Sequence, residues 1–151
     1  MIGQRLYLAL AIGLASVPVA AQTASPGVAG EPVFAEHRLT LQLSDKSPDK
    51  EALVLSVAAN VLKAYGPDKV AIEVVAFGPG VDLLSADNPN KALIESLIVQ
   101  GVRFDVCMNT VDTIERKTGK PFPLNPHAQK VVAGVERIIT LAEHGYVTVR
   151  P

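Results

Sequence analysis

The sequence predicts an α/β fold with three layers, in which helices cover both faces of a mostly parallel sheet of about five strands. Short apolar runs alternate along the chain with longer segments of helical periodicity, which is the order of elements that a parallel sheet requires. One of these runs, residues 70–77, is apolar almost throughout, as expected for a strand that is covered on both faces. We therefore expect this strand to lie at the centre of the sheet.

The segments before the central strand are expected to form a strand and a helix. Leucines alternate with polar residues over 39–43, which is the two-residue period of a strand. Ser47 and Pro48 then favour a helix start, because serine offers a capping oxygen and proline supplies the backbone angle of the first helical turn. Apolar residues recur on one face of this helix until Gly66, which is expected to end it.

The segments after the central strand continue the alternation. Gly78, Pro79 and Gly80 predict a turn, and Asn88 and Pro89 predict the start of a second helix that ends at Gly101. The remaining expected elements are a strand at 102–107, a helix at 110–118 closed by Gly119, a proline-rich loop, a helix with apolar residues from 131 to 142, and a last strand at 146–149.

The first 21 residues are typical of a secretory signal peptide. Arg5 is their only charge, an apolar run covers 6–17, and small residues precede a cleavage site near Ala21. The run is too short to span a bilayer. We therefore expect a periplasmic protein without stable membrane insertion, with a flexible lead-in at 22–36 and a single domain at 37–151.

Composition and motif searches exclude several classes of function. The chain has 14 basic and 15 acidic residues, and this balance is not that of a nucleic-acid-binding protein. The run Gly78-Pro79-Gly80 lacks both phosphate-binding patterns, GxxxxGK(S/T) and GxGxxG, and Pro79 has no amide group to offer a phosphate. His127 and His144 show no ligand spacing to the cysteine. The sequence therefore predicts neither a metal site nor a bound cofactor.

Cys107 is the only cysteine of the chain, so it cannot form a disulfide within the domain. It ends the expected strand 102–107, just before the expected helix at 110–118. A thiol beside a helix start has a lowered pKa and is a better nucleophile. Three interpretations remain open at this point: a reactive thiolate, a small buried apolar residue, or a thiol paired with another chain.

Parallel strands place their carboxyl ends at one edge of the sheet, and ligand sites of open α/β sheets lie there. Three segments of this sequence reach that edge, at 44–48, 78–89 and 107–110. With Cys107 as the candidate catalytic residue, the candidate pocket or thiolate-stabilising residues are Ser44, Gly78, Gly80, Asn109 and Thr110.

Four segments carry a resemblance to a known family. They are the run GVRFDVCMNT at 101–110, VVAFGPG at 74–80, GVERI at 134–138, and the closing Gly145 and Tyr146. Together they resemble the DsrE/DsrF-like family of small sulfur-relay proteins, in its exported branch, over about residues 37–151. The resemblance implies an α/β domain that associates into trimers or hexamers. It also implies a cysteine after the third strand that carries sulfane sulfur, and Cys107 matches that position.

Three hypotheses follow for the function. In the first, the protein is a sulfur carrier or sulfurtransferase that holds a persulfide on Cys107 and exchanges sulfur with a donor or acceptor protein. In the second, it is a non-catalytic oligomeric binding or assembly module with a buried, structural Cys107. In the third, Cys107 forms a redox-sensitive dimer. The export signal and the lack of a second, resolving cysteine separate this chain from the cytoplasmic sulfur-relay proteins.

Overall fold

The computed structural model describes residues 30–151. The predicted signal peptide at 1–21 and the first part of the predicted lead-in, residues 22–29, lie outside the described residues. Residues 30–36 contain no helix or strand. Glu31 forms an ion pair with Arg38, and Ala35 packs against the smaller of the two apolar clusters. This end of the lead-in therefore lies against the domain.

The described residues form five strands, four α-helices and one 3₁₀ helix. In chain order these are β1 (His37–Leu43), α1 (Pro48–Tyr65), β2 (Val70–Ala76), η1 (Gly78–Leu84), α2 (Lys91–Val99), β3 (Arg103–Cys107), α3 (Met108–Thr118), β4 (Gln129–Val131), α4 (Gly134–Glu143) and β5 (Val147–Val149). None of the helices in residues 30–151 has the length and apolar character needed to cross a membrane.

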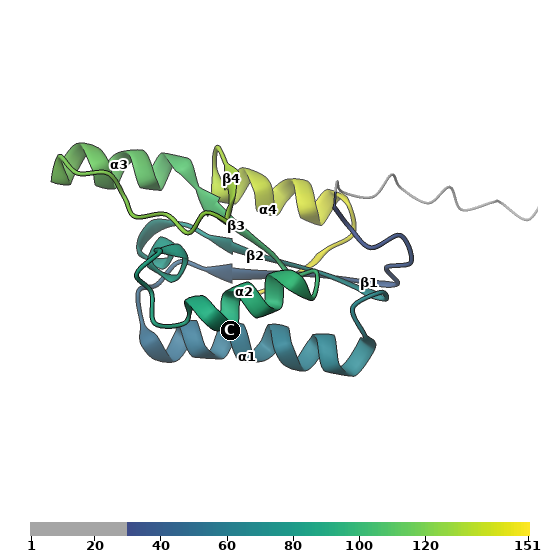
Figure 1. Cartoon of the computed structure of the whole chain (residues 1–151). Coiled ribbons are helices and arrows are strands. Elements are labelled where there is room, and N and C mark those ends of the chain that lie inside the picture. The colour runs from purple at the N-terminus through teal and green to yellow at the C-terminus, as the bar shows by residue number, and fades with distance from the viewer. Residues whose placement is uncertain (1–29) are drawn as a thin grey trace, which may run out of the picture.

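The five strands pair in the order β4-β3-β2-β1-β5, and every pair is parallel. The helices α1 and α2 cover one face of the sheet and α4 covers the other, while α3 extends past the carboxyl ends of the strands (Figure 1). The predicted three-layer α/β/α fold is therefore confirmed. The strand β2 is central and every one of its residues is buried, as its apolar sequence predicted.

The main apolar core lies between the sheet and the helices α1 and α2. Leu41, Val74 and Phe104 are paired neighbours on β1, β2 and β3, and all three are buried in this core. The helix α1 contributes residues from one of its faces, namely Val54, Leu55, Ala58 and Leu62. Burial of this set fixes the order of the strands, and with it the position of their carboxyl ends.

Two helices begin at other residues than the sequence predicted. Asn88 does not cap α2, because its side-chain amide donates to the Asp82 carbonyl (2.9 Å) and to Glu51 (3.1 Å), and its oxygen accepts from the Asn90 N–H (2.9 Å). The helix begins after Asn90 instead. The helix α3 begins at Met108 and not at Thr110, so that Cys107 itself is the capping residue.

The segment around residue 131 was predicted wrongly. Val131 and Val132 were expected on the last helix, but Gln129–Val131 forms the edge strand β4 and α4 begins only at Gly134. β-branched residues suit a strand, and the pairing of β4 with β3 outweighs the apolar spacing that resembled a helix. The prediction of a simple turn at 78–80 also missed the 3₁₀ helix η1.

The face of the sheet under α4 carries charged groups in its interior. Glu73 on β2 and Asp105 on β3 are fully buried. The Nε atom of Arg137 on α4 donates to the carboxylates of both Glu73 and Asp105, at 3.0 Å in the case of Asp105. Arg103 lies 3.4 Å from Glu73. Buried carboxylates require such partners, since water cannot solvate them.

The two buried carboxyl groups differ in their protonation. Burial, together with the hydrogen bond to Glu73 and its negative charge, raises the pKa of Asp105 to about 8. Burial alone would raise the pKa of Glu73 as well, but hydrogen bonds from Asp105 and Arg137 bring it below its usual value. At neutral pH, Asp105 is therefore protonated and donates to an ionised Glu73.

The buried Asp105 predicts a dependence of stability on pH. The usual pKa of aspartate is about 3.9, so between roughly pH 4 and 8 the folded chain keeps a proton on Asp105 that the unfolded chain releases. The free energy of unfolding should therefore fall as the pH rises through this window. The Asp105→Asn variant does not titrate, so between pH 5 and 8 its stability relative to the wild type should increase.

Denaturant unfolding of both proteins at several pH values measures this difference. The exposed Asp68→Asn substitution is the matched control, and its curve should run parallel to that of the wild type. Parallel curves for Asp105→Asn and the wild type would show that Asp105 is ionised in the folded protein.

Gly80 offers a second test of the packing. A Cβ atom at this position would overlap the carbonyl group of Leu43, at the end of β1. Gly80→Ala should lower the free energy of unfolding by about 1–3 kcal/mol, the usual cost of overpacking. Gly119→Ala is the control, because open space surrounds Gly119 and only its left-handed backbone (φ 66°) opposes a side chain, at a cost of about 1 kcal/mol. A smaller loss for Gly80→Ala than for Gly119→Ala would contradict this packing.

Candidate functional site

Cys107 is both the last residue of β3 and the residue that caps α3. Alternate residues of a strand point to opposite faces, so Phe104 and Val106 enter the main core while Asp105 and Cys107 point towards the side of α4. Cys107 is 6% exposed. The thiol therefore lies just beneath the surface, where the carboxyl end of β3 meets the starts of two helices.

Several hydrogen-bond donors surround the sulfur atom of Cys107. Burial by itself opposes ionisation, but the nearby Thr110 hydroxyl and the backbone N–H groups of Gly134, Thr110 and Asn109 lower the pKa of the thiol below its usual value. The protonated thiol has an acceptor as well, since its sulfur lies 3.9 Å from the Val132 carbonyl oxygen. The site thus favours the thiolate, which is the nucleophilic form of cysteine.

The donors come from the amino-terminal ends of two helices. Asn109 and Thr110 lie in the first turn of α3, and Gly134 is the first residue of α4. The Asn109 N–H also donates to the Val132 carbonyl (3.1 Å), which joins the start of α3 to the segment that leads into α4. Each helix start carries a partial positive charge, so both helices stabilise a negative charge on the sulfur.

The Thr110 hydroxyl links Cys107 to the loop after the central strand. The Gly78 N–H donates to the Thr110 Oγ1 atom (3.0 Å), and Gly78 has a left-handed backbone (φ 53°) that suits glycine. Among the groups that lower the pKa of Cys107, the Thr110 hydroxyl has the largest effect. The Thr110 side chain therefore connects the Gly78 backbone with the surroundings of Cys107.

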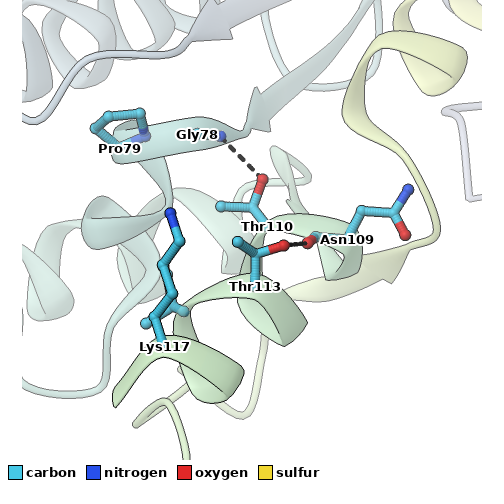
Figure 2. Close-up of a pocket in the computed structure, with 7 residues that line it drawn as sticks. Gly78, Pro79, Asn109, Thr110, Thr113 and Lys117 are labelled. Atoms are coloured by element: carbon cyan, nitrogen blue, oxygen red, sulfur yellow. Dashed lines mark hydrogen bonds between the residues drawn. The ribbon is translucent and has the colours of Figure 1, made fainter.

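A cleft of about 420 Å³ lies beside this arrangement. Its lining residues come from the start of η1 and from α3; they are Gly78, Pro79, Asn109, Thr110, Thr113, Ile114 and Lys117. The Lys117 side chain extends from α3 towards Pro79 (Figure 2). Cys107 is not among the lining residues, but Thr110 both lines the cleft and lowers the pKa of the Cys107 thiol. The Thr110 hydroxyl therefore lies between the cleft and the thiol.

The structure brings some of the predicted site residues together and leaves others apart. Gly78, Asn109 and Thr110 surround Cys107 or line the cleft, in the arrangement described above. Gly80 instead packs against the end of β1, so its role is structural. Ser44 does not line the cleft, although its carbonyl group lies close to Gly78.

Sequence reasoning missed Gly134 and Val132, both of which contact the sulfur of Cys107. They were missed because both were expected inside the last helix, where the backbone N–H groups bond within the helix. A signal was present, since Gly134 follows a β-branched pair and precedes the apolar residues of α4. Nothing in residues 30–151 gathers three or more metal-ligating side chains.

Comparison with known proteins identifies the fold but not a family. No family model matches the chain, and no curated protein matches it. A solved structure of a protein of unknown function from Methanobacterium thermoautotrophicum is similar, with a TM-score of 0.68 and 28% sequence identity. The similarity covers 77% of this chain and 100% of that one. This chain therefore shares the complete fold of a natural domain whose own function is unknown.

The role of the Thr110 hydroxyl predicts the reactivity of Cys107. Thr110→Val keeps the shape of the side chain but removes the donor, so the pH midpoint of Cys107 alkylation by iodoacetamide should rise. The rate at pH 7 should fall by roughly three- to tenfold, the usual net weight of a single hydrogen bond.

Thr113→Val is the matched control for this experiment. Thr113 lies on the same helix and lines the same cleft, but its hydroxyl donates to the Asn109 carbonyl (2.8 Å). Its pH profile should match that of the wild type. Equal profiles for Thr110→Val and the wild type would show that the hydroxyl does not stabilise the thiolate.

Proposed function

We propose that this protein is a sulfur carrier that holds sulfane sulfur as a persulfide on Cys107. The observation that carries the proposal is the position of Cys107 at the start of α3 and beside the segment that leads into α4, where the surrounding donor groups lower the pKa of its thiol. A persulfide anion places its negative charge on sulfur, so the same donors suit both the attacking thiolate and the loaded product.

The proposed loading step is a thiolate exchange that needs no oxidant. The Cys107 thiolate attacks the outer sulfur of a donor persulfide, R–S–SH, and a bond forms between the two sulfur atoms. The S–S bond of the donor breaks, its electron pair leaves with the donor sulfur as R–S⁻, and the proton stays on the transferred sulfur. Unloading is the same exchange, with the thiolate of an acceptor as the attacking group. The protein is a sulfurtransferase if it accelerates these steps.

The cleft beside Thr110 is the proposed site for the donor or acceptor. Pro79 and Ile114 give it apolar walls, and Lys117 supplies a positive charge. A thiol carried on a flexible segment or a small molecule suits this site better than a rigid protein surface does, because Cys107 is 94% covered.

The resemblance to the DsrE/DsrF-like family supports the same function, because Cys107 matches the sulfur-carrying position. Export to the periplasm is part of the proposal. In that oxidising compartment an exposed thiol would be overoxidised or form mixed disulfides. The small exposure of Cys107 limits such reactions.

Association into a homo-oligomer, a trimer or hexamer by the resemblance, remains a prediction. Three apolar side chains are exposed at this face: Val132 just before α4 (72%), and Val135 (54%) and Ile139 (55%) on α4 itself. They are the first side chains that a second copy would be expected to cover.

The alternative is a non-catalytic binding or assembly module in which Cys107 only fills space. The burial of Cys107 favours this alternative, since small buried cysteines are common in protein cores. The two functions differ in the reactivity of the native thiol, and a single experiment separates them.

The sulfur-carrier proposal predicts a change in intact mass. Folded protein incubated with a sulfane-sulfur donor should gain about 32 Da, the mass of one sulfur atom, and a thiol reductant should reverse the gain. The Cys107→Ser variant should show no gain. A loaded variant, or a wild-type thiol that reacts only after denaturation, would contradict the proposal, and the second result would favour the module with a structural cysteine.

A further inference from the structure

The buried charged groups under α4 lie on the same face of β3 as Cys107. Asp105 and Cys107 are two residues apart on this strand, so their side chains point in the same direction. Glu73 lies on the neighbouring strand β2 and is within hydrogen-bond distance of Asp105. The sulfur and the two carboxyl groups therefore face α4 together.

Arg137 connects these carboxyl groups to the start of α4. It lies three residues after Gly134, so both residues belong to the first turn of the helix. Its Nε atom donates to Glu73 and to Asp105, and the Arg137 side chain is 16% exposed. Because this one atom bonds to residues on the adjacent strands β2 and β3, it fixes the distance between the first turn of α4 and the sheet.

We propose that Arg137, held by Glu73 and Asp105, positions the start of α4 so that the segment from Val132 to Gly134 lies against the Cys107 sulfur. Arg137 is then a positioning residue for the reactivity of Cys107, although it does not contact the sulfur. This inference rests on the proposed function only in requiring that the Cys107 thiolate reacts in the folded protein.

The surroundings of Gly134 explain why its position needs such a device. A Cβ atom at Gly134 would lie 2.9 Å from Cβ of Phe77, so the backbone passes very close to the sheet there. The apolar cluster on this side is small, with Ala71, Val75, Leu141 and Tyr146 as its buried members. Leu141 and Tyr146 lie at and beyond the far end of α4, so the ion pairs of Arg137 provide the main polar anchor at the near end.

Two variants can separate positioning from long-range electrostatics. Arg137→Lys keeps the positive charge but loses the guanidinium Nε atom that reaches both carboxyl groups. Glu73→Gln removes a negative charge, which by electrostatics alone would favour the thiolate and lower the midpoint of alkylation. If the role of Glu73 is to hold Arg137, the same variant should raise the midpoint. The two explanations thus predict opposite signs for Glu73→Gln.

The experiment measures the rate of Cys107 alkylation by iodoacetamide from pH 5 to 10 on the full mature chain. Circular dichroism shows that each variant is folded, and Arg150→Met is the control, since Arg150 pairs with Asp45 at an exposed site. We expect midpoints shifted to higher pH for Arg137→Lys and for Glu73→Gln. At pH 7 both rates should be roughly three- to tenfold below that of the wild type, while the control should be unchanged.

The outcomes distinguish this inference from the proposed function. A lowered midpoint for Glu73→Gln, or wild-type profiles for both folded variants, would overturn the positioning role and leave sulfur loading of the wild type untouched. A wild type that alkylates readily but never gains sulfur would overturn the carrier function alone. A wild-type thiol that reacts only after denaturation would overturn both.

Discussion

The double hydrogen bond of Arg137 to Glu73 and Asp105 is the interaction on which the arrangement of the site depends. It joins α4 to two central strands of the sheet, on the face where apolar packing is least extensive. The start of α4 then brings Gly134 and Val132 to the sulfur of Cys107. Buried ion pairs often add little net stability, because desolvation offsets their attraction. Geometric specificity is the better explanation for burying these charges here.

The strand and helix pattern could be predicted from the sequence because it depends on local periodicity and on turn residues. The apolar run of β2 identified the central strand, and the glycines after α1 and α3 marked their ends correctly. The short strand β4 could not be predicted in this way, because three residues carry too little periodicity and its pairing with β3 is a long-range contact. Because β4 was missed, the predicted start of α4 was too early, and the contribution of Gly134 to the site was not recognised.

The candidate site was predictable in part for a related reason. Parallel topology alone places Cys107, Gly78 and Thr110 at one edge of the sheet, and in the structure Gly78 donates to Thr110, whose hydroxyl lowers the pKa of Cys107. The buried charges were overlooked although each interrupts an apolar strand, Glu73 in β2 and Asp105 in β3. A charged residue in a buried strand requires a partner of opposite sign, and only the structure shows that this partner is Arg137 on α4.

These relationships form a pattern that can be recognised in other sequences. An acidic residue two positions before the cysteine shares its strand face, as Asp105 does, and an arginine three positions after a helix-starting glycine shares its first turn, as Arg137 does. A related domain with the cysteine but without this aspartate and arginine would lack the link between the sheet and the helix that corresponds to α4. Its thiol would keep the donor groups at the start of the helix that corresponds to α3, because those depend only on the junction of β3 with that helix. Such a domain should therefore have a weaker nucleophile on the same fold, and the cysteine alone is a poor guide to sulfur chemistry in proteins of this architecture.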